Sequence, residues 1–316
     1  MAVRFLQRAA IFVASLFVSS ILVFAFMAVL PGDPARVALG VDASEESVQA
    51  LRDQFGLNRS IVVQYLDWVR GLLTLDPGTS YISQVPIGPQ VADRLQVTAL
   101  LVVASMAIAA TLALPFGILM AVRHSKPSGL FLSALSQVGV AVPAFLAGIL
   151  LITVFAVSLR WLPPNGWTPP DQDAVMFVKQ LTLPALSLGL VQGAVLTRYV
   201  RSAVLDVLRE DYLRTARSKG LRPGQALRRH GLRNAAVPVV TVLALQLATL
   251  LIGTVVVERV FVIPGLGSLL LDSVSNRDLV VVQDVVMILV VAVLFVNFLV
   301  DLAYLLIDPR LRTGHS

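Results

Sequence analysis

The residues with the most regular spacing lie in DYLRTARSKGLRPGQALRRHGLRNAAVP, residues 211–238, between two long apolar runs. Seven of these residues are Lys or Arg, and Asp211 is the single acid among them. Tyr212, Ala216 and Gly220 recur every four residues, so in a helix they share one face. Small residues let another backbone come close, and tyrosine is a frequent anchor in binding interfaces. The chemistry that this pattern favours is recognition of a partner.

The same stretch also fits a helix that lies on anionic lipid headgroups, which attract each basic residue by about 1 kcal/mol. Spacing alone leaves both interpretations open. Helix formers dominate residues 211–219, and Gly220 suits a left-handed helix end. Pro223 suits the first turn of a second helix, and we expect Pro238 to open the next membrane span. The stretch is therefore predicted to be helix, glycine hinge, helix and membrane.

The chain carries no motif for catalysis. It has no GxxxxGK[ST] phosphate loop, no HExxH and no GxSxG pattern, so ATP hydrolysis by the usual nucleotide-binding device is excluded. His124, His230 and His315 are scattered, and the absence of cysteine excludes disulfides and thiolate metal sites. We expect no catalytic, cofactor or metal site in this chain.

Composition indicates a membrane protein. The 316 residues are 57% hydrophobic and 14% charged, whereas soluble proteins have about 25% charged residues. A membrane helix needs about 20 apolar residues, and six runs reach that length, at about 9–30, 97–122, 130–158, 180–200, 236–260 and 281–307. We expect one all-α, multi-pass membrane domain over residues 1–316 in the cell membrane. The first run exceeds the usual apolar region of a signal peptide, so we expect it to remain as an anchor.

The distribution of charge predicts the orientation. With both termini inside, the internal segments 1–8, 123–129, 198–235 and 308–316 hold 16 Lys and Arg against four acids. This asymmetry follows the positive-inside rule, and the net charge of +6 needs no nucleic-acid partner. Residues 198–235 are then a cytoplasmic loop, and residues 31–96 an external one.

The external loop is long enough to have structure of its own. Ser44 can cap a helix that Gly56 ends, and residues 62–73 show a second amphipathic pattern. We expect these helices to cap the outer mouth or to pack on the lipid headgroups, and both local packing and docking of a partner stay open. Farther along, Pro264 and two glycines interrupt the apolar segment 258–278, so it must lie within protein or at the external interface.

Several polar side chains lie within the predicted spans. They could line a route through the membrane, although interhelical hydrogen bonding is the simpler role. They are Ser105, Ser136, Gln137, Gln192 and Gln246.

The spacing Tyr212-x-x-x-Ala216-x-x-x-Gly220, with Pro238 18 residues later, resembles the cytoplasmic "EAA" loop of ABC-importer permeases. Further blocks resemble the dipeptide/oligopeptide-type permease subunit and cover nearly the whole chain in order. They are LPGDP (30–34), FGLNRSIVVQYLDWVRGLL (55–73), DYLRTARSKGL (211–221), RRHGLRNAAVPVVT (228–241), ERVFVIPGLG (258–267) and DLAYLLIDPR (301–310). Arg214 departs from the general loop motif, which has Glu at that position.

The resemblance implies a type I importer fold with six transmembrane helices, in which residues 211–221 form a coupling helix seated in a cytoplasmic ATPase subunit. The residues expected to make that contact are Asp211, Tyr212, Arg214, Thr215, Ala216, Arg217, Lys219, Gly220 and Leu221. The implied partners are a paralogous permease subunit, two ABC ATPase subunits or domains that bind ATP and Mg, an external substrate-binding protein, and membrane lipid.

The implied function is ATP-driven import of di- or oligopeptides, and permeases similar to these also serve nickel, glutathione or haem. A proton- or ion-coupled secondary carrier is the alternative from another class. It is favoured by Asp301 within the last span, since intramembrane acids usually mark function. A passive structural subunit is a third interpretation, under which deletion of the chain would leave uptake unchanged.

Overall fold

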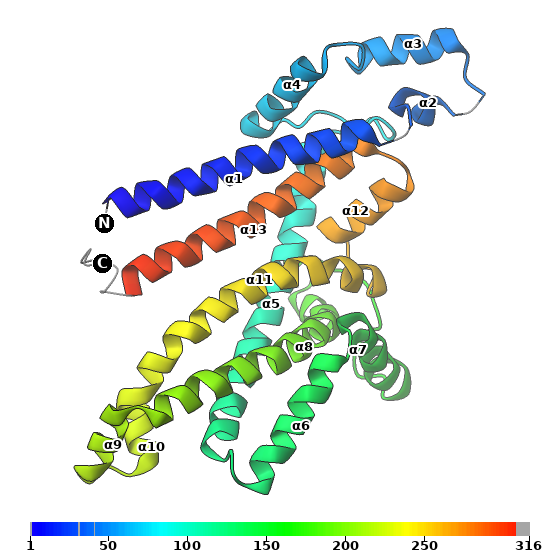
Figure 1. The fold of residues 1–316 in the computed structure, drawn as a ribbon. Helices are drawn as coiled ribbons and strands as arrows, with labels where there is room; N and C mark the ends of the chain where they lie inside the picture. Colours follow the sequence, from blue (N-terminus) through cyan, green and yellow to red (C-terminus); the bar gives the residue numbers. More distant parts are fainter. Residues whose placement is uncertain (1, 31, 41, 308–316) are drawn as a thin grey trace. The chain divides into compact units, whose positions relative to one another are not determined.

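The computed structural model describes residues 2–30, 32–40 and 42–307, and apart from a single bridge between Thr79 and Pro86 its regular structure there is helical (Figure 1). The terminal Asp-Pro-Arg block of residues 308–310 lies outside the described residues. The α-helices are α1 Ala2–Val29, α2 Pro34–Leu39, α3 Glu45–Gln54, α4 Ile61–Thr74, α5 Ile87–Val122, α6 Pro127–Ala141, α7 Ala144–Leu151, α8 Ala174–Arg209, α9 Asp211–Ser218, α10 Pro223–Ala226, α11 Leu232–Val260, α12 Leu266–Ser275 and α13 Leu279–Ile307. Two π-helical turns, Ile152–Ser158 and Leu227–Gly231, follow α7 and α10.

The number of membrane spans agrees with the sequence prediction. Among the described residues, five helical segments are long and apolar enough to cross a membrane, and α6 with α7 makes a sixth if that bent pair is one span. The predicted span 130–158 is not a straight helix, because the pair bends by 100° between Ala141 and Ala144. Pro143 lacks an N–H group and restricts Val142 to extended backbone, at φ −86° and ψ 122°. The proline therefore explains the break.

The predicted start of span five was wrong. Pro238 does not open α11, since the helix begins at Leu232 and Pro238 lies inside it. Pro115 and Pro184 are likewise inside α5 and α8. Membrane helices accommodate such prolines where neighbouring groups satisfy the carbonyl that each proline frees four residues earlier. These prolines leave the long helices continuous.

The chain divides into two compact units. Among the described residues, the first comprises residues 2–98 and 264–298, and the second comprises residues 99–263 with 299–307. In the first unit, the two helices predicted before residue 75 are present. Ser44 caps α3 by accepting from the Ser47 N–H, and Gly56 follows the helix with φ +70°. The amphipathic run 62–73 falls within α4.

Aromatic contacts join the helices of the first unit. The rings of Phe12 on α1 and Phe298 on α13 stack with centroids 4.9 Å apart, and these two helices lie side by side in Figure 1. α4 packs on α1, where the Ser20 hydroxyl and the Tyr65 hydroxyl are 2.8 Å apart and the Phe24 and Tyr65 rings meet edge to face. These contacts fix α4 against the first apolar helix.

The start of α13 is tied to α4 and to the loop after it. Trp68 Nε1 donates to Asp284 Oδ1 over 2.7 Å, and the Ser80 hydroxyl donates to Asp278. Both acids are buried, at 0% and 6% exposure for Asp284 and Asp278. Since a buried carboxylate is costly without hydrogen bonds, these donors stabilise the junction.

The segment interrupted by Pro264 packs within protein, which is one of the two places predicted for it. Its short helix α12 buries Leu266 and Leu269 together with Ile87 and Val91 of α5 and Val281 of α13. The Leu266 N–H donates to the Thr98 hydroxyl over 2.8 Å. The irregular backbone before α12 therefore has partners from protein.

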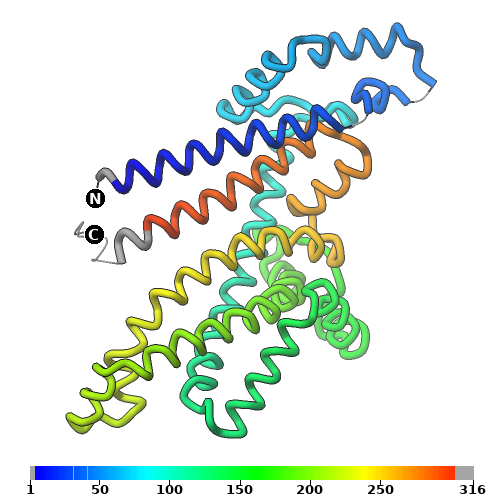
Figure 2. Tube along the Cα trace, viewed as in Figure 1, coloured from blue at the N-terminus to red at the C-terminus, as the bar shows by residue number. Residues whose placement is uncertain are grey.

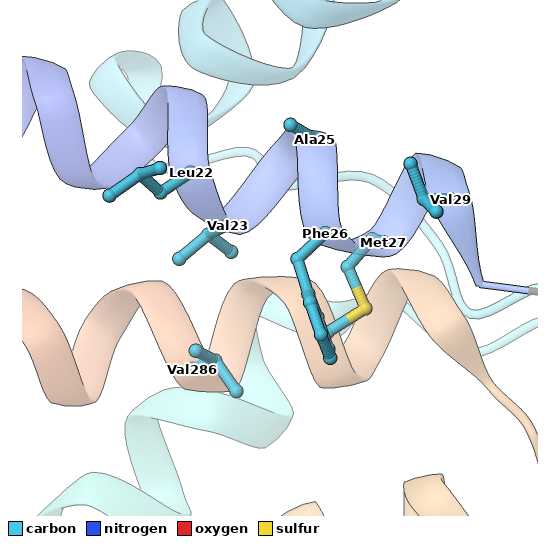
Figure 3. A pocket seen from close by; sticks show the side chains of 7 residues that line it. All are labelled: Leu22, Val23, Ala25, Phe26, Met27, Val29 and Val286. Atoms are coloured by element: carbon cyan, nitrogen blue, oxygen red, sulfur yellow. The ribbon is translucent and has the colours of Figure 1, made fainter.

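An open groove of about 570 Å³ lies along the second half of α1, with Val286 of α13 at its edge (Figure 3). Its lining side chains are all apolar and come from Leu22, Val23, Ala25, Phe26, Met27, Val29 and Val286. A groove of this composition suits lipid or another apolar helix rather than a polar solute.

In the second unit, α8 and α11 lie side by side along much of their length, with α9 and α10 at one end (Figure 2). Small residues allow the other helices to come close to α8. A Cβ on Gly117 of α5 would lie 2.6 Å from Val200, and a Cβ on Gly189 of α8 would lie 2.8 Å from Ile108 of α5. This close packing positions the basic stretch at the end of α8.

Candidate functional site

The basic stretch is more compact than its charge suggests. α8 continues to Arg209, so the connection between the long helices α8 and α11 is residues 210–231, which we term the basic loop. Glu210 in extended conformation precedes α9, and Asp211 places an acid in its first turn. That carboxylate is favourable there because helix N-termini carry partial positive charge.

The predicted hinge is present. Gly220 has φ +91°, in the left-handed region that glycine adopts without strain. Its N–H donates to the Arg217 carbonyl over 3.0 Å, and the Leu221 N–H reaches back to the Ala216 carbonyl over 3.3 Å. Pro223 then occupies the first turn of α10, as predicted. α9 and α10 are thus separate rigid elements joined by a tight turn.

One buried side chain fastens α9 to the long helices. Leu213 is 2% exposed and lies in a core cluster with Val204 and Val207 of α8, Leu227 of the π-helical turn, and Ala235 of α11. Burying a leucine side chain contributes about 1.5–3 kcal/mol. α9 is therefore a fixed extension of α8 and α11.

Gly231 makes that fastening possible. A Cβ at this position would lie 2.7 Å from Leu227 Cδ1, 3.0 Å from Val207 Cγ1 and 3.4 Å from Leu213 Cδ1. The missing side chain lets the start of α11 pass directly against the leucine core. A polar bond adds to this, since Asn234 Nδ2 donates to the Tyr212 hydroxyl over 2.9 Å.

The predicted contact residues fall into two groups. Ala216 and Leu221 are half-buried and pack against the core of the second unit. The other seven are exposed, namely Asp211, Tyr212, Arg214, Thr215, Arg217, Lys219 and Gly220. Tyr212 and Ala216 share a face as predicted, but that face is partly turned toward the chain's own core.

The exposed side of the basic loop is strongly cationic. Arg214, Arg217 and Lys219 on or beside α9 are exposed, and so are Arg222, Arg228 and Arg229 in the following turns. Arg233, in the first turn of α11, adds another exposed cation beside the loop. Arg214 approaches Asp211 at 3.3 Å, but both side chains are largely exposed and such pairs contribute little to stability. This surface is suited to electrostatic attraction of an acidic partner or an anionic headgroup.

Sequence reasoning missed Leu213, Gly231 and Asn234 as parts of this site. Leu213 is a lone leucine among polar residues on α9, and the sequence Gly231-Leu232 interrupts a basic run. Those signals become meaningful only when the chain turns back at Gly220 and brings α11 beside α9. The contact between residues 213 and 231 is thus a product of tertiary structure.

Comparison with known proteins agrees with this architecture. Residues 113–313 match the family described as "Binding-protein-dependent transport system inner membrane component", and residues 1–104 match the N-terminal region described for the same system's membrane component. Two solved ABC transporters show the same fold. The chain aligns with an inward-facing MetNI methionine transporter at TM-score 0.59 and 19% identity, covering 69% of this chain and 96% of that one. It aligns with an amino acid ABC transporter crystallised with histidines at TM-score 0.52 and 18% identity, covering 68% and 92%.

Relatives of known name match over nearly their whole length. The Sinorhizobium fredii protein named "Probable peptide ABC transporter permease protein y4tP" is 37% identical over 312 residues, which are 99% of this chain and 100% of that protein. The glutathione transport system permease protein GsiC of Pectobacterium atrosepticum is 40% identical over 309 residues, 98% of each. GsiC of Escherichia coli K12 is 38% identical over 303 residues, 95% of each. This chain belongs to the binding-protein-dependent transport system inner membrane component family.

Proposed function

We propose that this chain is the permease subunit of an ATP-driven importer of short peptides and that the basic loop couples it to cytoplasmic ATPase subunits. Family membership makes it a membrane component of a binding-protein-dependent system. The relatives are named for peptide and for glutathione transport, and glutathione is itself a modified tripeptide. Peptides of two to a few residues are the substrate class common to both.

The observation that carries the coupling role is the burial of Leu213 in the core shared by α8 and α11. A partner that moves α9 also moves both long helices, because α9 cannot shift without breaking that packing. We propose that closure of the ATPase subunits on ATP pushes α9 and so turns the pathway outward, where a substrate-binding protein delivers the peptide. Hydrolysis by the ATPases and release of their products reset the chain inward.

The proposed role implies an orientation in the membrane and a set of partners. The basic loop and both termini lie in the cytoplasm, and a second permease subunit completes the pathway. ATP and Mg are bound by the ATPase subunits. The positive-inside distribution of Lys and Arg supports this orientation, and the cationic exposed surface of the basic loop supports an acidic docking groove on the ATPase.

Reconstitution tests this function directly. The assembled complex, purified through a tag on this chain, is placed in liposomes with its binding protein and a labelled peptide. We expect uptake that requires ATP on the side of the ATPase subunits. Uptake by the isolated chain under a proton gradient without ATP would support the carrier alternative, and ATP-dependent uptake of nickel or haem but no peptide would overturn the substrate class.

A further inference from the structure

A pair of glutamine side chains joins α8 to α11 halfway along both helices. Gln246 Nε2 donates to Gln192 Oε1 over 2.7 Å. Gln192 lies at the middle of the 36-residue α8, and Gln246 lies at the middle of the 29-residue α11. Membrane helices of this kind place their central residues near the middle of the bilayer. The hydrogen-bonded pair Gln192–Gln246, which we term the rung, therefore lies deep within the membrane.

Apolar contacts flank this rung in both directions along the two helices. Toward the basic loop, Leu196 and Val200 of α8 belong to one core with Val239 of α11. Toward the other end, a Cβ on Gly253 would touch Leu188 Cδ2 at 3.4 Å. Hydroxyl groups near the rung are satisfied within their own helices, as Thr197 donates to the Gly193 carbonyl over 2.6 Å. The helices thus have packing to hold them together without an amide pair.

The pair has hydrogen-bonding capacity left over. Within the part of the chain that the structure describes, Gln192 Nε2 and Gln246 Oε1 have no hydrogen-bond partner. Neither of these two atoms is fully buried. Gln192 as a whole is nevertheless only 9% exposed. One amide donor and one amide acceptor consequently reach the surface of the helix pair side by side.

Lipid is an unfavourable neighbour for these atoms. An amide without a hydrogen bond costs several kcal/mol in hydrocarbon, and polar groups within membrane spans almost always face protein or a water-filled cavity. Secondary transporters bind their substrates near the bilayer midplane, at the interface between helices. The surface that bears the two free amide atoms is thus expected to face the pathway.

We infer that Gln192 and Gln246 form a station that hydrogen-bonds the backbone of a peptide passing through the pathway. This inference rests on the peptide-import function proposed above. Each residue of an extended peptide carries one backbone N–H donor and one C=O acceptor that point to the same side of the chain, and these match the free Gln246 Oε1 acceptor and the free Gln192 Nε2 donor. Because both side chains are neutral and contact only the backbone, the station accepts peptides of many side-chain sequences.

Blocking one peptide N–H tests the match. Transport is measured in the reconstituted complex with its own binding protein. The probes are labelled trialanine and labelled glutathione, and each is compared with an analogue that is N-methylated at one peptide nitrogen. The variant is Gln192→Met with Gln246→Met, because Met keeps the length and approximate volume of Gln. Gln7→Met on α1 is the matched control, since Gln7 is exposed and lies near the start of α1.

We expect the wild-type complex to carry the unmodified peptide about fivefold faster than its N-methylated analogue, as the loss of one hydrogen bond predicts. In the double Met variant, transport of the unmodified peptide falls and the ratio between the two probes approaches one. The Gln7→Met control keeps the wild-type ratio. If the double variant does not assemble, Gln246→Met alone is measured in the same way, because Gln246 is the less buried of the two.

Other outcomes overturn the inference. A merely structural bond between α8 and α11 predicts that both probes slow by the same factor in the variant, leaving the ratio at its wild-type value. That result removes the station and leaves the peptide-import function in place. If the wild-type complex carries neither trialanine nor glutathione, the proposed substrate class fails, and the station fails with it.

Discussion

The Tyr212 hydroxyl accepts a hydrogen bond of 2.9 Å from Asn234 Nδ2, which joins α9 to the first turn of α11. The neighbouring side chain, Leu213, is buried between the same helices. α9 is therefore held to α11 by one polar contact and one apolar contact on adjacent residues. This double attachment makes α9 suitable as a lever.

Removing the polar contact is expected to weaken coupling. Tyr212→Phe keeps the ring and deletes the hydroxyl, so the free energy of unfolding falls by about 0.5–1.5 kcal/mol. The number of peptides carried per ATP hydrolysed also falls. Tyr199→Phe is the control, because Tyr199 is a similarly exposed tyrosine, on α8. Equal coupling ratios in both variants would show that the Tyr212–Asn234 bond has no part in transmission.

Removing the apolar contact is expected to have a larger effect. Leu213→Ala leaves a cavity in a closed core, and such changes cost about 2–5 kcal/mol. Leu245→Ala is the matched control, since Leu245 on α11 is 56% exposed. We expect thermal unfolding of the purified complex at a clearly lower temperature for the Leu213 variant, with ATPase activity that no longer responds to the loaded binding protein. A normal response in that variant would contradict the lever.

Three glycines of the basic loop are expected to differ when changed to alanine. Gly231→Ala places a Cβ 2.7 Å from Leu227 Cδ1, so overpacking costs about 1–3 kcal/mol. Gly220→Ala meets no atom but has φ +91°, so its cost is about 1–2 kcal/mol of backbone strain. Gly224→Ala also meets no atom and lies in α10, where Ala favours the helix by up to about 1 kcal/mol.

Thermal unfolding of the three glycine variants checks this order. We expect the unfolding temperature of Gly224→Ala to equal or exceed that of wild type, and the unfolding temperatures of Gly220→Ala and Gly231→Ala to be lower than that of wild type. Gly220→Asn should recover part of the loss at that position, because Asn tolerates the left-handed region better than Ala. A Gly224→Ala protein that is as unstable as Gly231→Ala would contradict the packing described for the loop.

Much of this loop could be predicted from local sequence. Gly220 and Pro223 act through their own backbone preferences, which need no knowledge of distant residues. The extent of α8 could not be predicted in the same way, because the charged residues beyond position 200 suggested that the span had ended. α8 continues because Val204 and Val207 on its inner face pack against Leu213, and this contact exists only in the folded chain.

The junction between α4 and α13 provides a test of buried polar contacts. Trp68→Phe removes the donor to Asp284 Oδ1, while Asp284 Oδ2 has no partner among the described residues. The buried carboxylate then loses its hydrogen bond, at a cost of about 1–3 kcal/mol. Trp161→Phe is the control because Trp161 is 67% exposed. Thermal unfolding should separate the two variants, and equal unfolding temperatures would contradict the assigned contact.

Tyr81 is expected to make stability depend on alkaline pH. Burial raises its pKa above the ordinary value of 10.0, and the negative charges of Asp284 and Asp278 raise it further. Above about pH 10, unfolded chains lose the Tyr81 proton while folded ones retain it, so the free energy of unfolding falls as pH rises through that window. Tyr81→Phe retains the stacking on Phe55, whose ring centroid lies 4.0 Å away.

Denaturant unfolding at pH 9, 10 and 11 compares wild type with Tyr81→Phe. The difference in unfolding free energy between the two proteins should change with pH in this range, because only wild type has the extra titration. A constant difference between pH 9 and 11 would mean that Tyr81 has its ordinary pKa in the folded protein.

The polar residues of the spans show what sequence can and cannot establish. Interhelical hydrogen bonding was the simpler expectation, and it is confirmed for Ser136, which donates to the Ala194 carbonyl over 2.9 Å, and for Gln192 with Gln246. Ser105 is an exception, since its hydroxyl donates to the Leu101 carbonyl within its own helix. Composition identifies a side chain that needs a partner in the membrane. The partner itself depends on helix rotation, which distant packing sets.

Cross-linking from α9 tests the central claim most directly. The chain has no cysteine, so Thr215→Cys creates the one thiol of this chain at an exposed position of α9. The control, Val175→Cys, places the thiol at the exposed first turn of α8, at the end of that helix far from α9. A short thiol-reactive photo-cross-linker is attached in native membranes, and the captured product is identified by mass spectrometry. The account predicts that Thr215→Cys captures an ATP-hydrolysing subunit and that Val175→Cys does not. Capture of phospholipid alone from position 215 would contradict it.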